Sequence, residues 1–168
     1  MQTPARTIHV SVEQQTLELR EGGDVLQMFP ISTAAAGMGS EEGSMKTPMG
    51  AFEIAEKIGG GAEIGAVFKS REPTGEFGTE EHDDDLVQTR ILWLHGLEPH
   101  NANTRERYIY IHGTNHEREI GTPASHGCIR MRNEDVIDLF DRVKLNATVV
   151  VLPPGQNAQV DTGPSWRG

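Results

Sequence analysis

The chain reads RYIYIHGT at residues 107–114 and SHGCIR at residues 125–130. The first stretch is rich in aromatic and β-branched residues, which is typical of a β-strand, and it carries His112 near its end. The second stretch holds Cys128, the only cysteine of the 168-residue chain. The residues between His112 and Cys128 include glycine and proline, so we predict a loop that folds the cysteine back toward the histidine.

A lone cysteine beside a histidine is a candidate nucleophile, because an adjacent base can take the proton from the thiol. Gly127 removes side-chain bulk next to the sulfur, and the backbone N–H groups of His126, Gly127 and Cys128 are predicted to form an oxyanion hole. Arg130 adds a positive charge that favours a thiolate or holds a substrate carboxylate. We therefore expect His112 and the loop amides to lower the pKa of Cys128.

Two other roles for Cys128 stay open on the residues alone. One is an inert buried thiol, the ordinary state of an isolated cysteine in a reducing compartment. The other is a metal ligand, with His112, His116 and His126 as its partners. The chain has no second cysteine and no H-E-x-x-H pattern, and the histidine pair follows a strand rather than lying on a helix. We favour the nucleophile and predict neither a metal nor a cofactor.

The composition predicts a single, mainly β domain. Hydrophobic residues make up 36% of the chain, which also has 19 glycines and 9 prolines, as suits a fold rich in strands and turns. The formal net charge is −10, with 25 acidic and 15 basic residues, so a nucleic-acid backbone is an unfavourable partner.

Hydrophobic patterns place the expected elements along the chain. One amphipathic helix is predicted at about 134–143, with Asn133 as its N-cap. The catalytic domain is expected to span 1–152, with a long surface insertion at 58–88 and a polar tail at 153–168. Strands are predicted at 7–12, 16–20, 24–33, 51–57, 91–97, 108–112 and 148–152.

No part of the sequence reads as a membrane segment. The first ten residues alternate polar and apolar side chains and lack the apolar stretch of an export signal. No apolar run elsewhere approaches the roughly 20 residues that a membrane-spanning helix needs. A single cysteine agrees with a reducing compartment, so we expect a cytoplasmic protein without a membrane partner, or a periplasmic one if a leader was removed.

Three segments form a recognisable pattern: HGT at 112–114, IGTPASHGCIRM at 120–131, and KTPMG at 46–50. Together they resemble the L,D-transpeptidase (YkuD-like) catalytic domain family. The resemblance implies a β-sandwich or mixed sheet with one main helix packed on it. It also implies a cysteine that is acylated by a peptidoglycan stem tetrapeptide or muropeptide containing a diamino acid.

By this resemblance, Cys128 attacks the carbonyl of the diamino acid and expels the terminal D-alanine, forming a thioester. His112 is the base, and the Gly113 backbone orients its ring in place of a carboxylate. Arg130 contacts a substrate carboxylate. Residues expected to shape the substrate pocket are Ser125, His126 and Gly127.

The acceptor of the acyl group decides the reaction. Without a leader, we expect water to be the acceptor, which makes the protein an L,D-carboxypeptidase that trims muropeptide tetrapeptides during murein recycling. The alternative is an L,D-transpeptidase that forms cross-links or exchanges D-amino acids. A non-catalytic muropeptide-binding module is the alternative of another class, and the presence of both Cys128 and His112 argues against it.

Overall fold

The computed structural model describes residues 4–153. Within that range it has ten strands, one α-helix and two short 3-10 helices, which confirms the predicted mainly β fold with one main helix. The elements are β1 (Arg6–Ser11), β2 (Thr16–Glu21), β3 (Asp24–Ser32), β4 (Gly50–Ile58), β5 (Ala66–Lys69), β6 (Glu72–Phe77), β7 (Val87–Gly96), η1 (Pro99–Asn101), β8 (Tyr110–Thr114), η2 (Glu117–Glu119), β9 (Ile129–Met131), α1 (Asn133–Arg142) and β10 (Thr148–Leu152).

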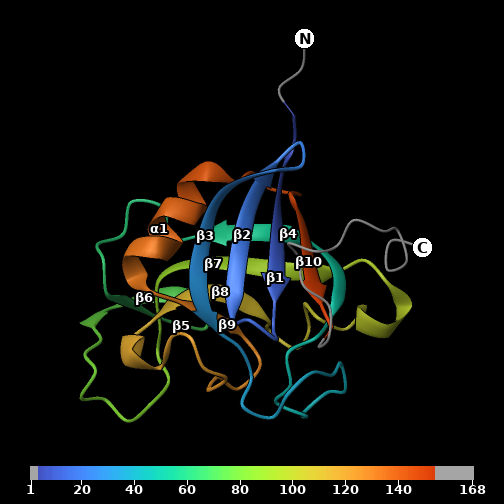
Figure 1. Cartoon of the computed structure of the whole chain (residues 1–168). Helices are drawn as coiled ribbons and strands as arrows, with labels where there is room; N and C mark the ends of the chain where they lie inside the picture. The colour runs from blue at the N-terminus through green and yellow to red at the C-terminus, as the bar shows by residue number, and fades with distance from the viewer. Residues whose placement is uncertain (1–3, 154–168) are drawn as a thin grey trace.

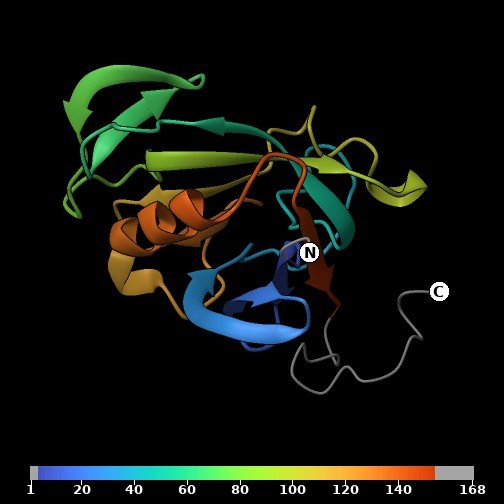
Figure 2. The same ribbon diagram turned by 90° about the horizontal axis from the view of Figure 1, so that it is seen from above.

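The strands form one mixed sheet in the order β4-β10-β1-β2-β3-β9-β8-β7-β5-β6. Strand β4 also pairs with β7, so the sheet closes on itself and the β5–β6 hairpin extends from β7 outside that closure. In Figure 1, β1, β2 and β3 stand upright in front of β7 and β8, which run across behind them. Figure 2 shows the two layers from above, with α1 at one end of the space between them.

The main core lies between these layers and is almost fully apolar. Alternation along the strands turns every second side chain inward, as with Ile8 and Val10 of β1. The helix contributes an apolar stripe at helical spacing, made of Val136, Leu139, Phe140 and Val143. This stripe packs α1 against β7 and β8, so the helix supports the strand that carries the HGT segment.

The start of the helix differs from the sequence-based prediction. Asn133 is the first helical residue, and the residue before it, Arg132, makes no side-chain capping hydrogen bond. The carboxylate of Glu117 performs that task instead, accepting a hydrogen bond from the Asn133 backbone N–H at 2.7 Å. The predicted role of Asn133 as N-cap is therefore wrong. The Glu117 side chain of η2 accepts a hydrogen bond from a backbone N–H at the helix start instead.

The segment 58–88 carries more structure than the predicted surface insertion. It contains the β5–β6 hairpin, and Val67 and Phe68 of β5 are buried. Strand β7 also begins at Val87, four residues before the predicted strand. In the predicted tail 153–168, residues 154–168 lie outside the described part of the chain. Between residues 4 and 153, no helix is both long enough and apolar enough to cross a membrane.

Candidate active site

The pairing of β8 with β9 brings the two chemical segments together. The strands are parallel, with Ile111 opposite Ile129 and His112 opposite Arg130. Both isoleucines point into the main core. Because side chains alternate along a strand, His112 and Arg130 occupy the other face, and Cys128, which directly precedes β9, joins them there. The 113–127 connection thus folds the cysteine back toward the histidine, as the loop prediction requires.

Backbone groups of two tyrosines contact the Cys128 thiol. The Tyr110 N–H donates a hydrogen bond to Sγ at 3.3 Å, and Sγ lies 3.4 Å from the Tyr108 carbonyl oxygen, to which it donates. Tyr108 has a φ of +57°, a conformation that costs energy for a residue other than glycine. This left-handed conformation turns the Tyr108 carbonyl toward the sulfur. The thiol is therefore held between a donor at the start of β8 and an acceptor in the β7–β8 connection.

The environment of Cys128 keeps its thiol protonated. Burial raises the pKa of Cys128 to about 11, outweighing the Tyr110 N–H, which lowers it. The negative charge of Asp85 raises the same pKa further, whereas Arg107 and Arg130 lower it. The expected lowering of the Cys128 pKa is thus wrong, since burial among apolar side chains dominates. A thiol of this kind needs a base at the moment of attack.

His112 is placed to be that base. Its ring is buried, and its Nδ1 lies 2.5 Å from the Gly113 carbonyl oxygen. A carbonyl only accepts hydrogen bonds, so Nδ1 carries the proton and Nε2 keeps its lone pair. Burial lowers the pKa of His112, more than the Asp85 charge and the Gly113 carbonyl raise it, so the ring is neutral. A neutral imidazole on the same face of β8 and β9 as a neutral thiol is suited to general-base chemistry.

The loop that carries Cys128 is fixed by hydroxyl groups. Ser125 Oγ donates to the Cys128 carbonyl at 2.6 Å and accepts from the Gly127 N–H at 3.3 Å. Thr47 Oγ1, from the KTPMG segment, donates to the Gly127 carbonyl at 2.9 Å and accepts from the Ala34 N–H at 3.0 Å. Gly127 has a φ of +130°, which a side chain would strain. Of the three predicted oxyanion donors, the Gly127 N–H thus already has a partner within the loop.

The site therefore combines a protonated thiol, a neutral histidine and a tightly held glycine turn on one face of the sheet. The YkuD model, described as the L,D-transpeptidase catalytic domain, matches residues 5–151 of this chain. The chain belongs to the L,D-transpeptidase family. Members of this family are cysteine enzymes.

Similar proteins and structures agree with this assignment. YkuD of Bacillus subtilis (strain 168), named as a candidate L,D-transpeptidase, is 30% identical over 145 residues, which are 86% of this chain and 64% of that protein. An L,D-transpeptidase from Mycobacterium smegmatis superposes with a TM-score of 0.57 at 18% identity, covering 89% of this chain and 59% of that one. LdtMt1, solved in complex with imipenem, gives a TM-score of 0.57 at 21% identity with the same coverage.

At these identities the likeness to the solved structures shows a shared fold. This L,D-transpeptidase domain spans 64% of the Bacillus relative and 59% of the two solved chains, so it corresponds to a part of each.

Arg130 and His126 differ in how they lie at the L,D-transpeptidase site. The Arg130 side chain is buried, and its guanidinium forms ion pairs with Asp85 at 3.2 Å and with Glu119 at 3.1 Å. Its substrate contact stays a prediction, and in this structure its charge is already matched by two carboxylates of the protein. The His126 side chain is exposed, with Nδ1 3.7 Å from Asp85. The sequence favours a solvated loop for the acidic run 80–85 over a substrate entrance, and it does not predict the ion pair of Asp85 with Arg130.

The carboxylates and histidines near the site are used within the protein. Within residues 4–153, no group of three or more His, Cys, Asp or Glu side chains is placed to hold a metal ion. His116, weighed as a metal ligand with Cys128, has its Nε2 2.7 Å from the His82 carbonyl oxygen. The histidine therefore helps to hold the acidic loop next to the site.

Asn133 packs against the backbone of the HGT segment and was not predicted as a site residue. Its Nδ2 donates to the Thr114 carbonyl at 2.9 Å, and its Oδ1 accepts from Thr89 Oγ1 at 2.6 Å and from Gln88 Nε2 at 3.1 Å. A Cβ atom on Gly113 would overlap the Asn133 amide and the Gln88 carbonyl. Only glycine fits there, so the HGT segment lies directly on the helix N-terminus. A helix-capping pattern was the only sequence signal for this residue.

Asn133→Leu is expected to destabilise the domain by about 3 kcal/mol, because three buried hydrogen-bonding groups lose their partner at once. Urea unfolding followed by fluorescence measures the change. Glu134→Gln, on the exposed side of the same turn, is the control and is expected to change stability by less than about 0.5 kcal/mol. Equal effects for the two substitutions would contradict the role given to the Asn133 amide.

The raised pKa of Cys128 predicts an unusual pH profile for alkylation. The alkylation rate with iodoacetamide is expected to rise with pH, with the midpoint of the rise near pH 11, because only the thiolate reacts. In the urea-unfolded chain the midpoint is expected near 9.0, the ordinary value. Cys128 is the only cysteine, so intact-mass spectrometry counts the reaction directly. A folded-state plateau beginning at the unfolded midpoint would contradict the burial argument.

Proposed function

We propose that this L,D-transpeptidase domain transfers acyl groups from peptidoglycan stem peptides through a thioester on Cys128. The observation that carries the proposal is that a protonated Cys128 and a neutral His112, whose Nδ1 is held by Gly113, lie on the same face of the paired strands β8 and β9. Such a pair attacks a carbonyl without a preformed thiolate. The family assignment supplies the substrate class, a stem peptide that ends in a D-amino acid.

In the first half-reaction, Sγ of Cys128 bonds to the carbonyl carbon of the diamino acid while His112 Nε2 accepts the thiol proton. The Gly113 carbonyl stabilises the imidazolium that forms. The tetrahedral intermediate then collapses, the bond to D-alanine breaks, and His112 returns the proton to the leaving amine. In the second half-reaction an acceptor attacks the thioester carbonyl and His112 takes the acceptor's proton. The carbon–sulfur bond then breaks, and His112 returns the proton to the sulfur, which restores the Cys128 thiol.

An amine is the proposed acceptor, which makes the reaction an L,D-transpeptidation. The relatives at both the sequence and the fold level are named L,D-transpeptidases, and this supports transfer over hydrolysis. The predicted L,D-carboxypeptidase and its recycling role rest on the expectation of a cytoplasmic protein, which stays a prediction. Water and amine compete for the same thioester, so one experiment separates the two reactions.

The test incubates the protein with a disaccharide tetrapeptide containing diaminopimelate, with and without a D-amino acid, and follows products by mass spectrometry. Exchange of D-alanine for the added D-amino acid supports transpeptidation. Tripeptide formed in water, unchanged by the acceptor, would replace it with a carboxypeptidase. Binding without any turnover would instead indicate the muropeptide-binding module and contradict acyl transfer.

A carbapenem is expected to acylate Cys128, because its strained carbonyl meets the same nucleophile as the peptide. The solved relative LdtMt1 was obtained in complex with imipenem. Intact-mass spectrometry is expected to show one adduct per chain, placed on Cys128 by peptide mapping. Ser125→Ala, which leaves the thiol in place but removes a loop hydrogen bond, is expected to slow the acylation rather than abolish it. An adduct on any other residue would contradict the assignment of the nucleophile.

A further inference from the structure

A cavity of about 330 Å³ lies beside the nucleophile, between β8 and the turn of the β5–β6 hairpin. Tyr108 and Tyr110 line it, and these are the residues whose backbone groups contact the Cys128 sulfur. Cys128 also packs in the same small cluster as Phe68 and Ile91, which form the apolar part of the wall. The cavity and the thiol therefore share Phe68, Ile91 and Tyr110 as neighbours.

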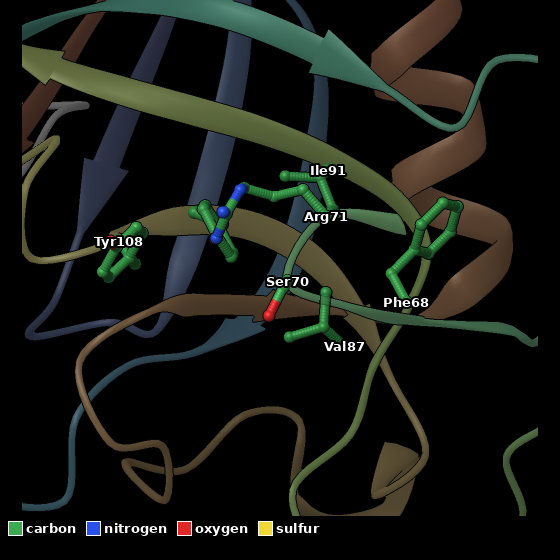
Figure 3. A pocket seen from close by; sticks show the side chains of 7 residues that line it. Phe68, Ser70, Arg71, Val87, Ile91 and Tyr108 are labelled. Atoms are coloured by element: carbon green, nitrogen blue, oxygen red, sulfur yellow. The ribbon is translucent and has the colours of Figure 1, made fainter. Parts of the chain in front are cut away.

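Arg71 supplies a positive charge in this cavity. Ser70 and Arg71 form the tight turn between β5 and β6, and both have positive φ angles, +49° and +66°. Figure 3 shows the Arg71 side chain extending from this turn along the cavity toward Tyr108. The hairpin thus carries a cation over the site that the sheet alone does not provide.

Aromatic rings hold the Arg71 guanidinium in place. Its Cζ lies 5.0 Å from the ring centres of both Trp93 and Tyr108, and Nη1 donates to the Tyr110 hydroxyl at 3.3 Å. Within residues 4–153, no carboxylate lies within ion-pairing distance of Arg71, and the charge of Glu56 acts on it from farther away. A second arginine on the Trp93 ring, Arg105, has its charge matched by Glu56 at 3.0 Å.

The chemistry of this arrangement favours a carboxylate ligand. The guanidinium presents N–H donors in a fork that matches a carboxylate, and aromatic contacts fix its plane in advance. A chain with a net charge of −10 repels anions on average, so a positioned cation beside the nucleophile has a local effect that the whole molecule lacks. A stem tetrapeptide brings two carboxylates near its scissile bond: the side-chain carboxylate of diaminopimelate and the terminal carboxylate of D-alanine.

We propose that Arg71 is a specificity-determining residue that binds a carboxylate of the acyl-donor stem peptide. This inference rests on the proposed acyl transfer and adds the substrate feature that the site selects. Arg71 discriminates charged from amidated stem peptides by binding, so its contribution appears mainly in KM.

The test compares three tetrapeptides: one with free diaminopimelate, one with its side-chain carboxylate amidated, and one ending in D-alaninamide. Wild-type protein is expected to lose about 10- to 100-fold in kcat/KM with one of the amidated peptides, mostly through KM. The amidated peptide with the lower kcat/KM identifies which carboxylate Arg71 binds. Arg71→Gln is expected to remove that preference, and Arg71→Lys is expected to restore part of it.

Arg105→Gln is the matched control. Arg105 also lies over the Trp93 ring, but its charge is already paired with Glu56. It is expected to keep the wild-type preference. The inference is overturned if wild type shows no preference, or if Arg71→Gln keeps it, and in either case acyl transfer itself stands.

Calorimetric binding to the Cys128→Ala protein separates the inference from the proposed function. That variant is expected to bind the charged peptide more tightly than the disfavoured amide, and the added Arg71→Gln change is expected to remove the difference. If wild type turns over none of the peptides, acyl transfer fails, yet these binding data still decide the role of Arg71.

Discussion

Cys128→Ala is expected to lower acyl transfer by at least about 10⁴-fold, because no other group in the site can form the thioester. The D-alanine release assay and the carbapenem adduct are expected to disappear together. Ser125 offers no substitute nucleophile, since its buried hydroxyl already donates to the Cys128 carbonyl. The loss therefore reports the chemical step itself.

Two measurements separate lost chemistry from lost structure. Thermal unfolding of Cys128→Ala is expected near the wild-type temperature, because alanine is a small change at a half-buried position outside the main core. Glu134→Gln, at an exposed position on α1, is the activity control and is expected to retain most of the rate. Turnover by Cys128→Ala at even one tenth of the wild-type rate would remove the thioester from the mechanism.

Much of this fold could be predicted because its signals are local. Alternation located most strands to within a few residues, and the predicted strand 148–152 coincides with β10. The helix was predicted within one residue at each end, because its apolar stripe has helical spacing. The motif also pointed to Cys128, His112 and Gly113, and the structure places all three around β8 and β9.

The elements that were missed have no local signal. Strand β9 is only three residues long, and it exists because it fills the space between β3 and β8. Strand β6 is exposed throughout and lacks the apolar alternation of a half-buried strand. The charge partners of Arg130 are Asp85, which lies just before β7 and 45 residues away along the chain, and Glu119 of η2. These features depend on which segments pair with one another in space, and the local pattern of residues along the sequence does not show that pairing.

The pKa of Cys128 is a similar case. The neighbouring amides and histidine indicate a lowered value, yet burial contributed by Phe68, Ile91 and Tyr110 raises it. These three residues come from β5, β7 and β8, so their approach to the thiol depends on the complete sheet. Because the thiol is not deprotonated in advance, a base has to accept its proton during the attack. His112 is therefore the second residue on which the reaction depends.

His112→Ala is expected to slow acylation by about 10²- to 10⁴-fold, the usual contribution of a general base. The residual rate is expected to increase with pH as the thiolate forms without help, toward the Cys128 pKa of about 11. Stopped-flow acylation by a carbapenem across this pH range measures both effects. His112→Gln, which keeps the bulk and a hydrogen-bond donor for Gly113, controls for packing and is expected to be equally slow.

The direction in which the wild-type acylation rate changes with pH tests the role of His112. Burial lowers the pKa of His112 below its ordinary 6.5, so the ring is a competent base at neutral pH. Acylation is expected to be level around pH 7 and to fall only when acid protonates His112, with a midpoint below 6.5. The His112→Ala protein is expected to lack this acid limb and to rise steadily with pH. A shared acid limb in both proteins would show that another group takes the thiol proton, and the general-base role of His112 would be lost.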